Sequence, residues 1–118
     1  MANTITYYNA VQTHYFAQDA DISAGYTTAQ FTRNFRVLDM TVFINAAVAG
    51  ATLTLSRYRG GVYSTIASFD ASGVGRAPIL IDIDQTAGLL ESGDFLFWQT
   101  SAAGVTSNSI VYVQQFSI

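Results

Sequence analysis

The chain has 118 residues, no cysteine, a formal net charge of −3, and 11% charged against 50% hydrophobic residues. This length accommodates one domain with a core of its own and excludes two. Without cysteine there are no disulfides and no thiolate metal sites or nucleophiles. The five cationic side chains are all arginines. A chain with so little positive charge is not expected to bind the phosphates of a nucleic acid.

The composition also bears on membranes and on location. No apolar run approaches the roughly 20 residues that a membrane-spanning helix requires, so we predict no membrane partner. The first residues lack the basic and apolar regions of a signal peptide, and we expect the protein to be made in the cytoplasm. Because few surface side chains can be charged, the remaining surface must be polar and uncharged or covered by neighbouring subunits.

The N-terminal third, residues 1–33, mixes β-forming and polar residues. Residues 4–8 and 11–16 are rich in tyrosine, threonine and other β-formers, which indicates strands or an extended arm. Residues 18–25 include two aspartates, a serine and a glycine and predict a loop, after which residues 26–31 predict a short strand. We therefore expect this third to supply an N-terminal arm and the first strand.

Two stretches in the middle of the chain alternate between hydrophobic and polar residues. Residues 36–45 place a hydrophobic side chain at every second position, which is typical of a half-buried strand. Residues 51–58 alternate again, and Leu53 and Leu55 are expected to point inward. The residues expected on the inward face of the first strand are Leu38, Met40, Val42 and Ile44.

A glycine pair at residues 60–61 separates the second of these strands from the next one. Two glycines between alternating strands predict a β-hairpin with a two-residue turn, because such turns require positive φ at the central positions. The turn fixes a register. It places Leu55 opposite Ile66 on the inner face and Tyr58 opposite Tyr63 on the outer face, as an aromatic cross-strand pair.

Three further strands follow in the second half of the chain. Residues 79–84 predict a strand after the only proline, Pro78, which is tolerated at the start of a strand. The Gly-Asp pair at 93–94 predicts a tight corner. The strand after it, residues 95–98, is hydrophobic on both faces. In the last strand, residues 109–118, one face is expected to carry Ile110, Tyr112, Gln114, Phe116 and Ile118.

The whole pattern indicates an all-β chain. No stretch of ten or more residues keeps a helical period with caps, so we expect almost no helix. Six to eight short strands separated by glycine-bearing turns are typical of two antiparallel sheets packed together. We therefore predict a single antiparallel β-sandwich domain over residues 1–118. A jelly-roll-like arrangement is favoured, because the Cys-Trp-Cys pattern of immunoglobulin domains is missing.

In this order the elements resemble the small β-sandwich domains in structural proteins of tailed bacteriophages. The resemblance is carried by the strand at residues 35–42, the strand and turn at 51–61, the Leu-Glu-Ser-Gly-Asp-Phe-Leu sequence at 90–96 and a closing hydrophobic strand. The Gly-Asp pattern is also similar to trimeric jelly rolls of the tumour-necrosis-factor and complement-globular-head type. One departure is the glycine pair at 60–61, where such phage domains often carry Asn-Gly.

The resemblance implies a non-enzymatic virion component that needs no cofactor. It implies a decoration or cement protein on the capsid exterior, which binds the major capsid protein, stabilises the phage head and forms a homotrimer. The alternative is a glycan- or receptor-binding knob at a fibre tip, or a carbohydrate-binding module. Fold alone does not separate the two functions, since unrelated functions share such sandwiches.

Aromatic side chains are the candidate interface residues. Large aromatic rings on an outer sheet face suit a protein interface or a platform for a sugar, and the strand at 95–98 has a second hydrophobic face to cover. We expect the N-terminal aromatic residues to anchor a swapped or capsid-clasping arm. The candidate interface residues are Tyr7, Tyr8, Tyr15, Phe16, Tyr58, Tyr63, Phe97 and Trp98.

The charged and titratable residues give no catalytic signature. Asp82 and Asp84 lie two apart in the predicted strand, so their carboxylates point the same way about 7 Å apart. They favour a solvated face, with calcium binding or pairing with arginines of a neighbouring subunit as alternatives. His14 is the single histidine, and no Gly-x-Ser-x-Gly sequence provides an activated serine. We therefore predict no catalytic residue and no metal site.

Overall fold

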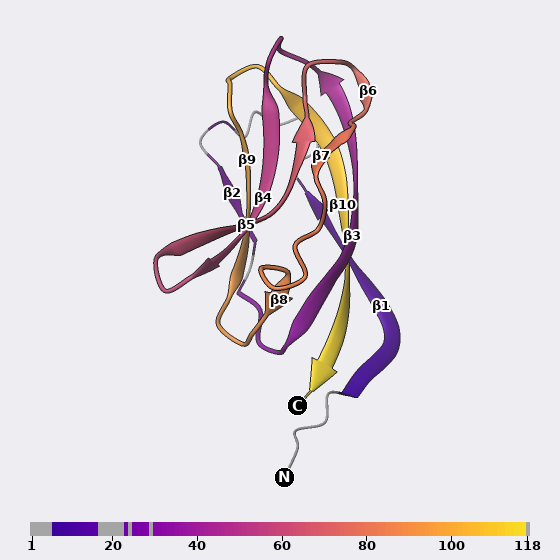
Figure 1. Cartoon of the computed structure of the whole chain (residues 1–118), viewed down its shortest axis with the longest axis vertical. Coiled ribbons are helices and arrows are strands. Elements are labelled where there is room, and N and C mark those ends of the chain that lie inside the picture. The colour runs from indigo at the N-terminus through magenta and orange to yellow at the C-terminus, as the bar shows by residue number, and fades with distance from the viewer. Residues whose placement is uncertain (1–5, 17–22, 24, 29, 118) are drawn as a thin grey trace.

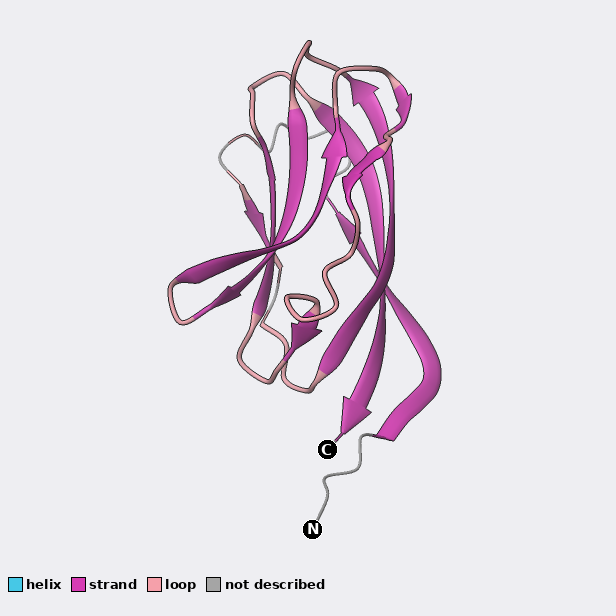
Figure 2. Cartoon of the chain, viewed as in Figure 1, coloured by secondary structure: helices cyan, strands magenta, loops and turns pink. Residues whose placement is uncertain are grey.

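The computed structural model describes residues 6–16, 23, 25–28 and 30–117, and for residues 6–16 only the backbone. This part of the chain forms ten β-strands and no helix, arranged as two layers (Figures 1 and 2). The strands are β1 (Thr6–Phe16), β2 (Tyr26–Thr27), β3 (Phe35–Ala46), β4 (Thr52–Arg59), β5 (Val62–Asp70), β6 (Gly75–Arg76), β7 (Ile79–Ile81), β8 (Leu89–Leu90), β9 (Phe95–Thr100) and β10 (Thr106–Ser117).

Two five-stranded antiparallel sheets pack against each other. In the first sheet the order is β1-β10-β3, and the other edge of β3 pairs with β6 near one end and with β8 near the other. In the second sheet the order is β2-β9-β4-β5-β7. The prediction of an all-β antiparallel sandwich is confirmed, and the described residues contain no helix. The jelly-roll connectivity stays a prediction.

The N-terminal stretch joins the first sheet as one long strand. The two segments predicted at residues 4–8 and 11–16 merge into β1, and a register shift between Tyr7 and Val11 marks the interruption between them. β1 pairs with β10, so residues 6–16 belong to the sandwich. The strand predicted at 26–31 is shorter and comprises β2 alone. Most of the loop predicted at 18–25 lies outside the described residues.

The inward face of β3 differs from the prediction at one position. Val37 is buried and Leu38 is only half-buried. The cause is a β-bulge, because Val37 pairs with Val113 while Asp39 pairs with the adjacent Tyr112, which leaves Leu38 without a partner on β10. Beyond the bulge the alternation is as predicted, and the buried residues are Met40, Val42 and Ile44.

The β4–β5 hairpin has the predicted turn. Gly60 and Gly61 both adopt positive φ, at 57° and 83°, as a primed two-residue turn requires. Tyr58 pairs with Tyr63 as predicted. The expected pairing of Leu55 with Ile66 is wrong: Leu55 pairs with Ala67, because a bulge follows Leu55 and adds one residue to β5.

Two strands in the C-terminal half of the chain, β7 and β10, differ from the prediction in their bounds, and β10 also differs in which side chains it buries. The strand predicted at 79–84 ends at Ile81, and β10 begins at Thr106 instead of residue 109. In β10 the core face carries Val111 and Val113, and Ile110, Tyr112 and Gln114 on the other face are half-buried, whereas Phe116 is buried. Ile118 lies outside the described residues.

The core lies between the two sheets, and β9 contributes two of its side chains. Leu96 and Trp98 are fully buried, and the Trp98 ring meets the edge of Phe69 at a centroid distance of 6.1 Å. They pack with aliphatic side chains from both sheets, since antiparallel strands send alternate side chains inward. The largest fully buried residues are Trp98, Ile44, Leu53, Leu55, Ile66, Leu90, Leu96, Val37, Val42, Val105 and Val111.

Candidate functional site

Four aromatic rings lie side by side on the outer face of the second sheet. Because Leu96 and Trp98 point into the core, the alternate residues of β9, Phe95 and Phe97, point outward. Cross-strand pairing places Tyr58 of β4 beside Phe95 and also beside a tyrosine of β5. We call the four residues Tyr58, Tyr63, Phe95 and Phe97 the aromatic face.

The rings of the aromatic face contact one another in an unbroken series. The centroid of Tyr58 is 4.7 Å from that of Tyr63 and 6.0 Å from that of Phe95, while Tyr63 lies 4.8 Å from Phe97. All three pairs are tilted, at 46°, 56° and 59°, and so avoid the face-to-face stacking that aromatic rings disfavour. Tyr63 is 56% exposed and the other three are half-buried. Rigid rings held by their neighbours lose little conformational freedom on binding, which suits them to contact a partner.

A shallow hollow of about 370 Å³ lies beside the aromatic face. Tyr63 and Phe97 form its aromatic side, and Thr54, Ser56 and Gln99 supply hydroxyl and amide groups. The Gln99 amide is held in place, since its Nε2 donates to the backbone oxygen of Ser23 at 2.9 Å. The hollow therefore combines ring faces with hydrogen-bonding groups, as the binding sites of polar ligands do.

Gly25 fixes one side of Phe97. A Cβ atom at this position would lie 2.2 Å from Cζ of Phe97, and Gly25 has φ of 94°, which favours glycine. The absent side chain lets the backbone lie directly on the Phe97 ring. From the sequence we predicted Gly25 only as part of a loop, and nothing local indicated the ring that it covers.

Arg59 and Asp94 form an ion pair below the aromatic face. Asp94 is buried, and its carboxylate accepts from Nε of Arg59 at 2.8 Å, from Nη2 at 2.6 Å and from the backbone N–H of Glu91 at 2.7 Å. Burial raises the pKa of Asp94, but the hydrogen bonds from Arg59 and Glu91 outweigh it and hold this pKa below its usual value. The hydrogen bond to Asp94 raises the pKa of Arg59.

β4 carries a second arginine, Arg57, and both arginines connect β4 to the β8 region. Nη1 of Arg57 donates to the backbone oxygens of Thr86 and Leu89, each at 3.2 Å, and Nη2 of Arg59 donates to Leu89 at 3.3 Å. These contacts close one end of the sandwich, because β8 belongs to the first sheet and β4 to the second. They hold in place the segment of β4 from which Tyr58 projects.

The structure brings some predicted interface residues together and places others elsewhere. Tyr58, Tyr63 and Phe97 meet in the aromatic face. The prediction for Trp98 is wrong, because Trp98 is 0% exposed and belongs to the core. The prediction missed Phe95, although its position two residues before Phe97 in an alternating strand was the available signal. The side chains of Tyr7, Tyr8, Tyr15 and Phe16 lie outside the described residues.

The two candidate aspartates do not share a strand, since β7 ends before them. Asp82 is exposed. Asp84 accepts from the backbone N–H groups of Thr86 at 2.8 Å and Ala87 at 2.9 Å and so stabilises the turn that follows. The hydrogen bonds from Ala87 and Thr86 hold the pKa of Asp84 below its usual value. Pairing of these aspartates with arginines of another subunit stays a prediction.

In residues 23–117, so far as they are described, no three histidine or acidic side chains gather as ligands for a metal ion. The described chain has no helix of the length and hydrophobicity that crossing a membrane requires. Compared with models of protein families, with curated proteins and with solved structures, the chain matches none of them.

Proposed function

We propose that this chain is a non-enzymatic structural protein of a virion, of the capsid decoration or cement type. In this proposal the aromatic face packs against sister subunits to close a homotrimer, and the trimer binds the major capsid protein on the outside of the head. The observation that carries the proposal is the series of four contacting rings on an outer sheet face, with Tyr63 more than half exposed. The virion itself comes from the resemblance to phage β-sandwich domains.

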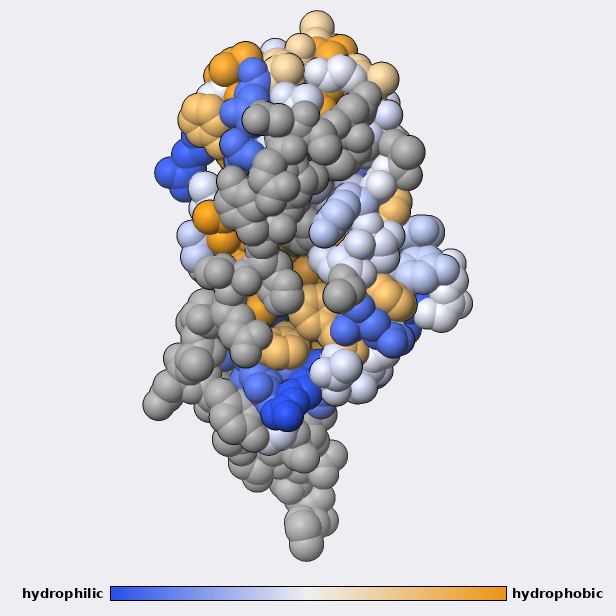
Figure 3. Space-filling view, turned by 180° about the vertical axis from the view of Figure 1, so that it is seen from behind, coloured by the Kyte–Doolittle hydropathy of each residue, from blue (hydrophilic) through white to orange (hydrophobic). Residues whose placement is uncertain are grey.

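Only 11% of the residues are charged, so much of the surface can be buried against another protein without removing charges from water. The hydrophobic effect contributes about 25 cal/mol for each Å² of apolar area buried, and aromatic residues dominate the energetics of protein interfaces. The space-filling view shows hydrophobic groups at the surface next to hydrophilic ones (Figure 3). Several weak contacts of this kind on one trimer would bind a capsid lattice strongly, because each further contact is intramolecular.

The mass of the protein in solution tests this proposal. We expect light scattering after size-exclusion chromatography to give three times the chain mass of 12.7 kDa. Tyr63→Lys should dissociate the trimer, since it places a charge in the buried interface. Val62→Lys is the matched control: Val62 is equally exposed, but neighbouring residues of a strand point to opposite faces. A monomeric wild type, or a Tyr63→Lys variant that stays trimeric, would contradict the proposal.

Capsid attachment needs a separate measurement. We expect the wild type to co-sediment with isolated tailed-phage capsids that lack their decoration protein, and Tyr63→Lys to remain in the supernatant. Co-sedimentation of both proteins to the same extent would show that the aromatic face has no part in attachment. A wild-type trimer that binds no capsid would restrict the proposal to subunit assembly.

The second candidate is a glycan- or receptor-binding knob, and the hollow beside Tyr63 and Phe97 favours it. Ring faces together with the hydroxyl groups of Thr54 and Ser56 and the amide of Gln99 offer the mixed contacts that a sugar requires. A glycan array separates the candidates. Binding by the wild type that is lost in both Tyr63→Ala and Gln99→Ala, without affinity for capsids, would establish the knob, and an array without any signal would exclude it for the glycans displayed.

A further inference from the structure

The chain crosses from the first sheet to the second between β6 and β7, and the crossing leaves part of the β3 edge uncovered. On the β3 side, the N–H of Ala77 donates to the oxygen of Val42 at 3.0 Å. On the β5 side, the oxygen of Pro78 accepts from the N–H of Asp70 at 2.9 Å. Near the start of β3 the same edge pairs with β8. In the described part of the chain, no strand pairs with residues 38–41 on this edge.

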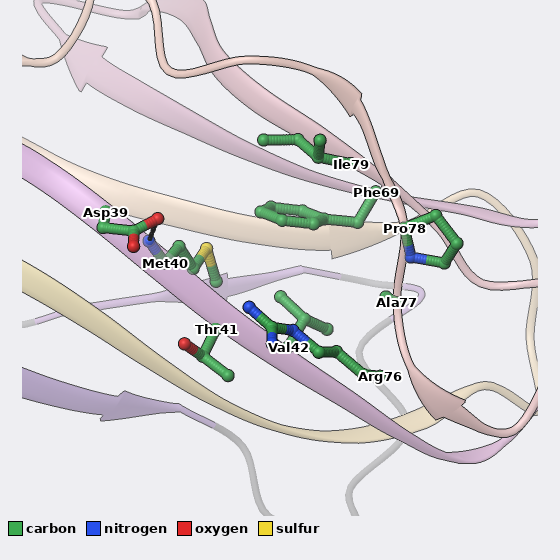
Figure 4. A pocket seen from close by; sticks show the side chains of 9 residues that line it. All are labelled: Asp39, Met40, Thr41, Val42, Phe69, Arg76, Ala77, Pro78 and Ile79. Atoms are coloured by element: carbon green, nitrogen blue, oxygen red, sulfur yellow. Dashed lines mark hydrogen bonds between the residues drawn. The ribbon is translucent and has the colours of Figure 1, made fainter.

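A shallow hollow of about 360 Å³ lies between the uncovered edge of β3 and the start of β7 (Figure 4). This volume is in the range of small-molecule sites, about 300–1,000 Å³. Most of its wall is hydrophobic and combines buried core side chains with two exposed ones, and such a wall suits an aliphatic chain. The hydrophobic residues of the wall are Met40, Val42, Phe69, Ala77, Pro78 and Ile79.

A carboxylate lies at one end of the hollow. The backbone oxygen of Val42 points away from β10, toward Ala77, and the backbone of Met40, two residues earlier in the same register, points to this side too. The N–H of Met40 donates to Oδ1 of Asp39 at 2.7 Å, which holds the carboxylate at the uncovered edge. In the described part of the chain Oδ2 of Asp39 has no partner. Asp39 is exposed, so a cation can reach this oxygen.

A guanidinium group approaches the hollow from the other end. Arg76 pairs with Phe43, four residues beyond Asp39, so the two backbones are about 14 Å apart along β3. Figure 4 shows the Arg76 side chain extending along β3 in the direction of Asp39. Within the described residues Arg76 is exposed and forms no hydrogen bond or ion pair, with Asp39 or with any other side chain. Hydrophobic wall therefore separates two opposite charges that do not neutralise each other.

We propose that this hollow binds a free aliphatic ω-amino acid, a molecule with an ammonium group at one end of a hydrocarbon chain and a carboxylate at the other. Arg76 binds the carboxylate, because the planar guanidinium group matches its two oxygens. Asp39 binds the ammonium group, and the hydrocarbon chain lies on the hydrophobic wall. An α-amino acid has both charges at one end and cannot reach both side chains at once.

Amide NMR shifts measure this binding and locate it. We expect 6-aminohexanoate to bind with a Kd of about 1 mM, a modest affinity for so small a ligand, and to shift the amide signals of Met40, Val42 and Ala77. Leucine is the matched control ligand, because it is an isomer of 6-aminohexanoate with both charges at one end. It should bind at least about fivefold more weakly. Equal affinities for the two isomers, or no shifts at these three amides, would overturn the proposal.

Two analogues that lack one charge each test the two ends of the ligand. Hexanoate lacks the ammonium group and hexylamine lacks the carboxylate. Each should bind about three- to fivefold more weakly than 6-aminohexanoate, as expected for the loss of one exposed ion pair. If hexanoate binds as tightly as 6-aminohexanoate, Asp39 does not bind the ammonium group and the assignment of an amino acid is wrong.

Two variants assign these ends to their side chains. Arg76→Gln should weaken 6-aminohexanoate about three- to fivefold and leave hexylamine unchanged. Asp39→Asn should weaken 6-aminohexanoate to the same extent and leave hexanoate unchanged, and its amide oxygen can still accept from the N–H of Met40. Arg33→Gln is the control variant, since Arg33 is exposed and does not line the hollow. If Arg76→Gln binds 6-aminohexanoate as tightly as Arg33→Gln does, Arg76 has no part in the site.

This inference does not rest on the proposed function, because the hollow and the aromatic face are different surfaces. Tyr63→Lys should leave the Kd of 6-aminohexanoate unchanged. Loss of the trimer with binding retained concerns the aromatic face alone. A retained trimer that binds 6-aminohexanoate and leucine equally overturns only the site in the hollow.

Discussion

Removing Arg59 should cost more stability than removing any ordinary exposed arginine. In Arg59→Ala the buried carboxylate of Asp94 loses two short hydrogen bonds and its counter-charge, and retains the N–H of Glu91. Breaking a buried ion pair from one side costs about 3–5 kcal/mol. Because 38% of the Arg59 side chain reaches solvent, water screens part of this interaction, and we expect a loss of about 2–3 kcal/mol.

Urea unfolding measures this loss. For a domain of this size the slope of the unfolding free energy is of the order of 1–1.5 kcal/mol per molar urea, so the midpoint should fall by about 2 M. Arg33→Ala is the matched control, since Arg33 is exposed, and its midpoint should change by less than about 0.5 M. Equal midpoints for the Arg59 and Arg33 variants would refute the assignment of this ion pair as a stabilising contact.

Three further predictions concern pH, the core and the hairpin. The folded pKa of Asp94 is lowered, so its contribution to stability is complete above about pH 4, the unfolded pKa of an aspartate, and is lost as pH falls through the folded pKa. The urea midpoint of Asp94→Asn should therefore vary less with pH over this acid range than that of the wild type. If the two proteins show the same dependence of midpoint on pH, Asp94 does not cause the loss of stability in acid. Trp98→Ala should lower the unfolding free energy by about 3–5 kcal/mol and Tyr63→Ala by less than about 1 kcal/mol, because Trp98 is buried and Tyr63 is exposed. Equal losses in the two variants would contradict this difference in burial. Gly61→Ala should cost about 1–2 kcal/mol in thermal unfolding because φ there is 83°, and an unchanged melting temperature would show that the turn relaxes.

Hydrophobic alternation was enough to predict most of the sandwich. It located β3 and β4, the Gly-Asp corner at 93–94 located β9, and the two glycines at 60–61 predicted the turn and the Tyr58–Tyr63 pair. It failed wherever a β-bulge adds a residue, as at Leu38 and at Ile66. A bulge changes which face the following side chains take, and no residue type at these positions marks it.

The candidate site was less predictable because it depends on contacts between distant residues. Phe97 and Trp98 are both aromatic neighbours in one strand, so the strand alone could not indicate which of them faces the core. Arg59 and Asp94 are 35 residues apart in sequence. Asp94 was predicted as a turn residue, and it does accept from Glu91 in that turn. Arg59 comes within hydrogen-bond distance of Asp94 only in the folded chain.

If the aromatic face closes a homotrimer, Tyr63 becomes covered when the protein assembles. Hydroxyl-radical footprinting over a range of protein concentrations measures this, with Val74, an exposed residue remote in sequence from the aromatic face, as the internal reference. We expect modification of Tyr63 to fall several-fold as the trimer forms, while modification of Val74 stays constant. Equal modification of Tyr63 in the monomer and in the assembled protein would contradict it.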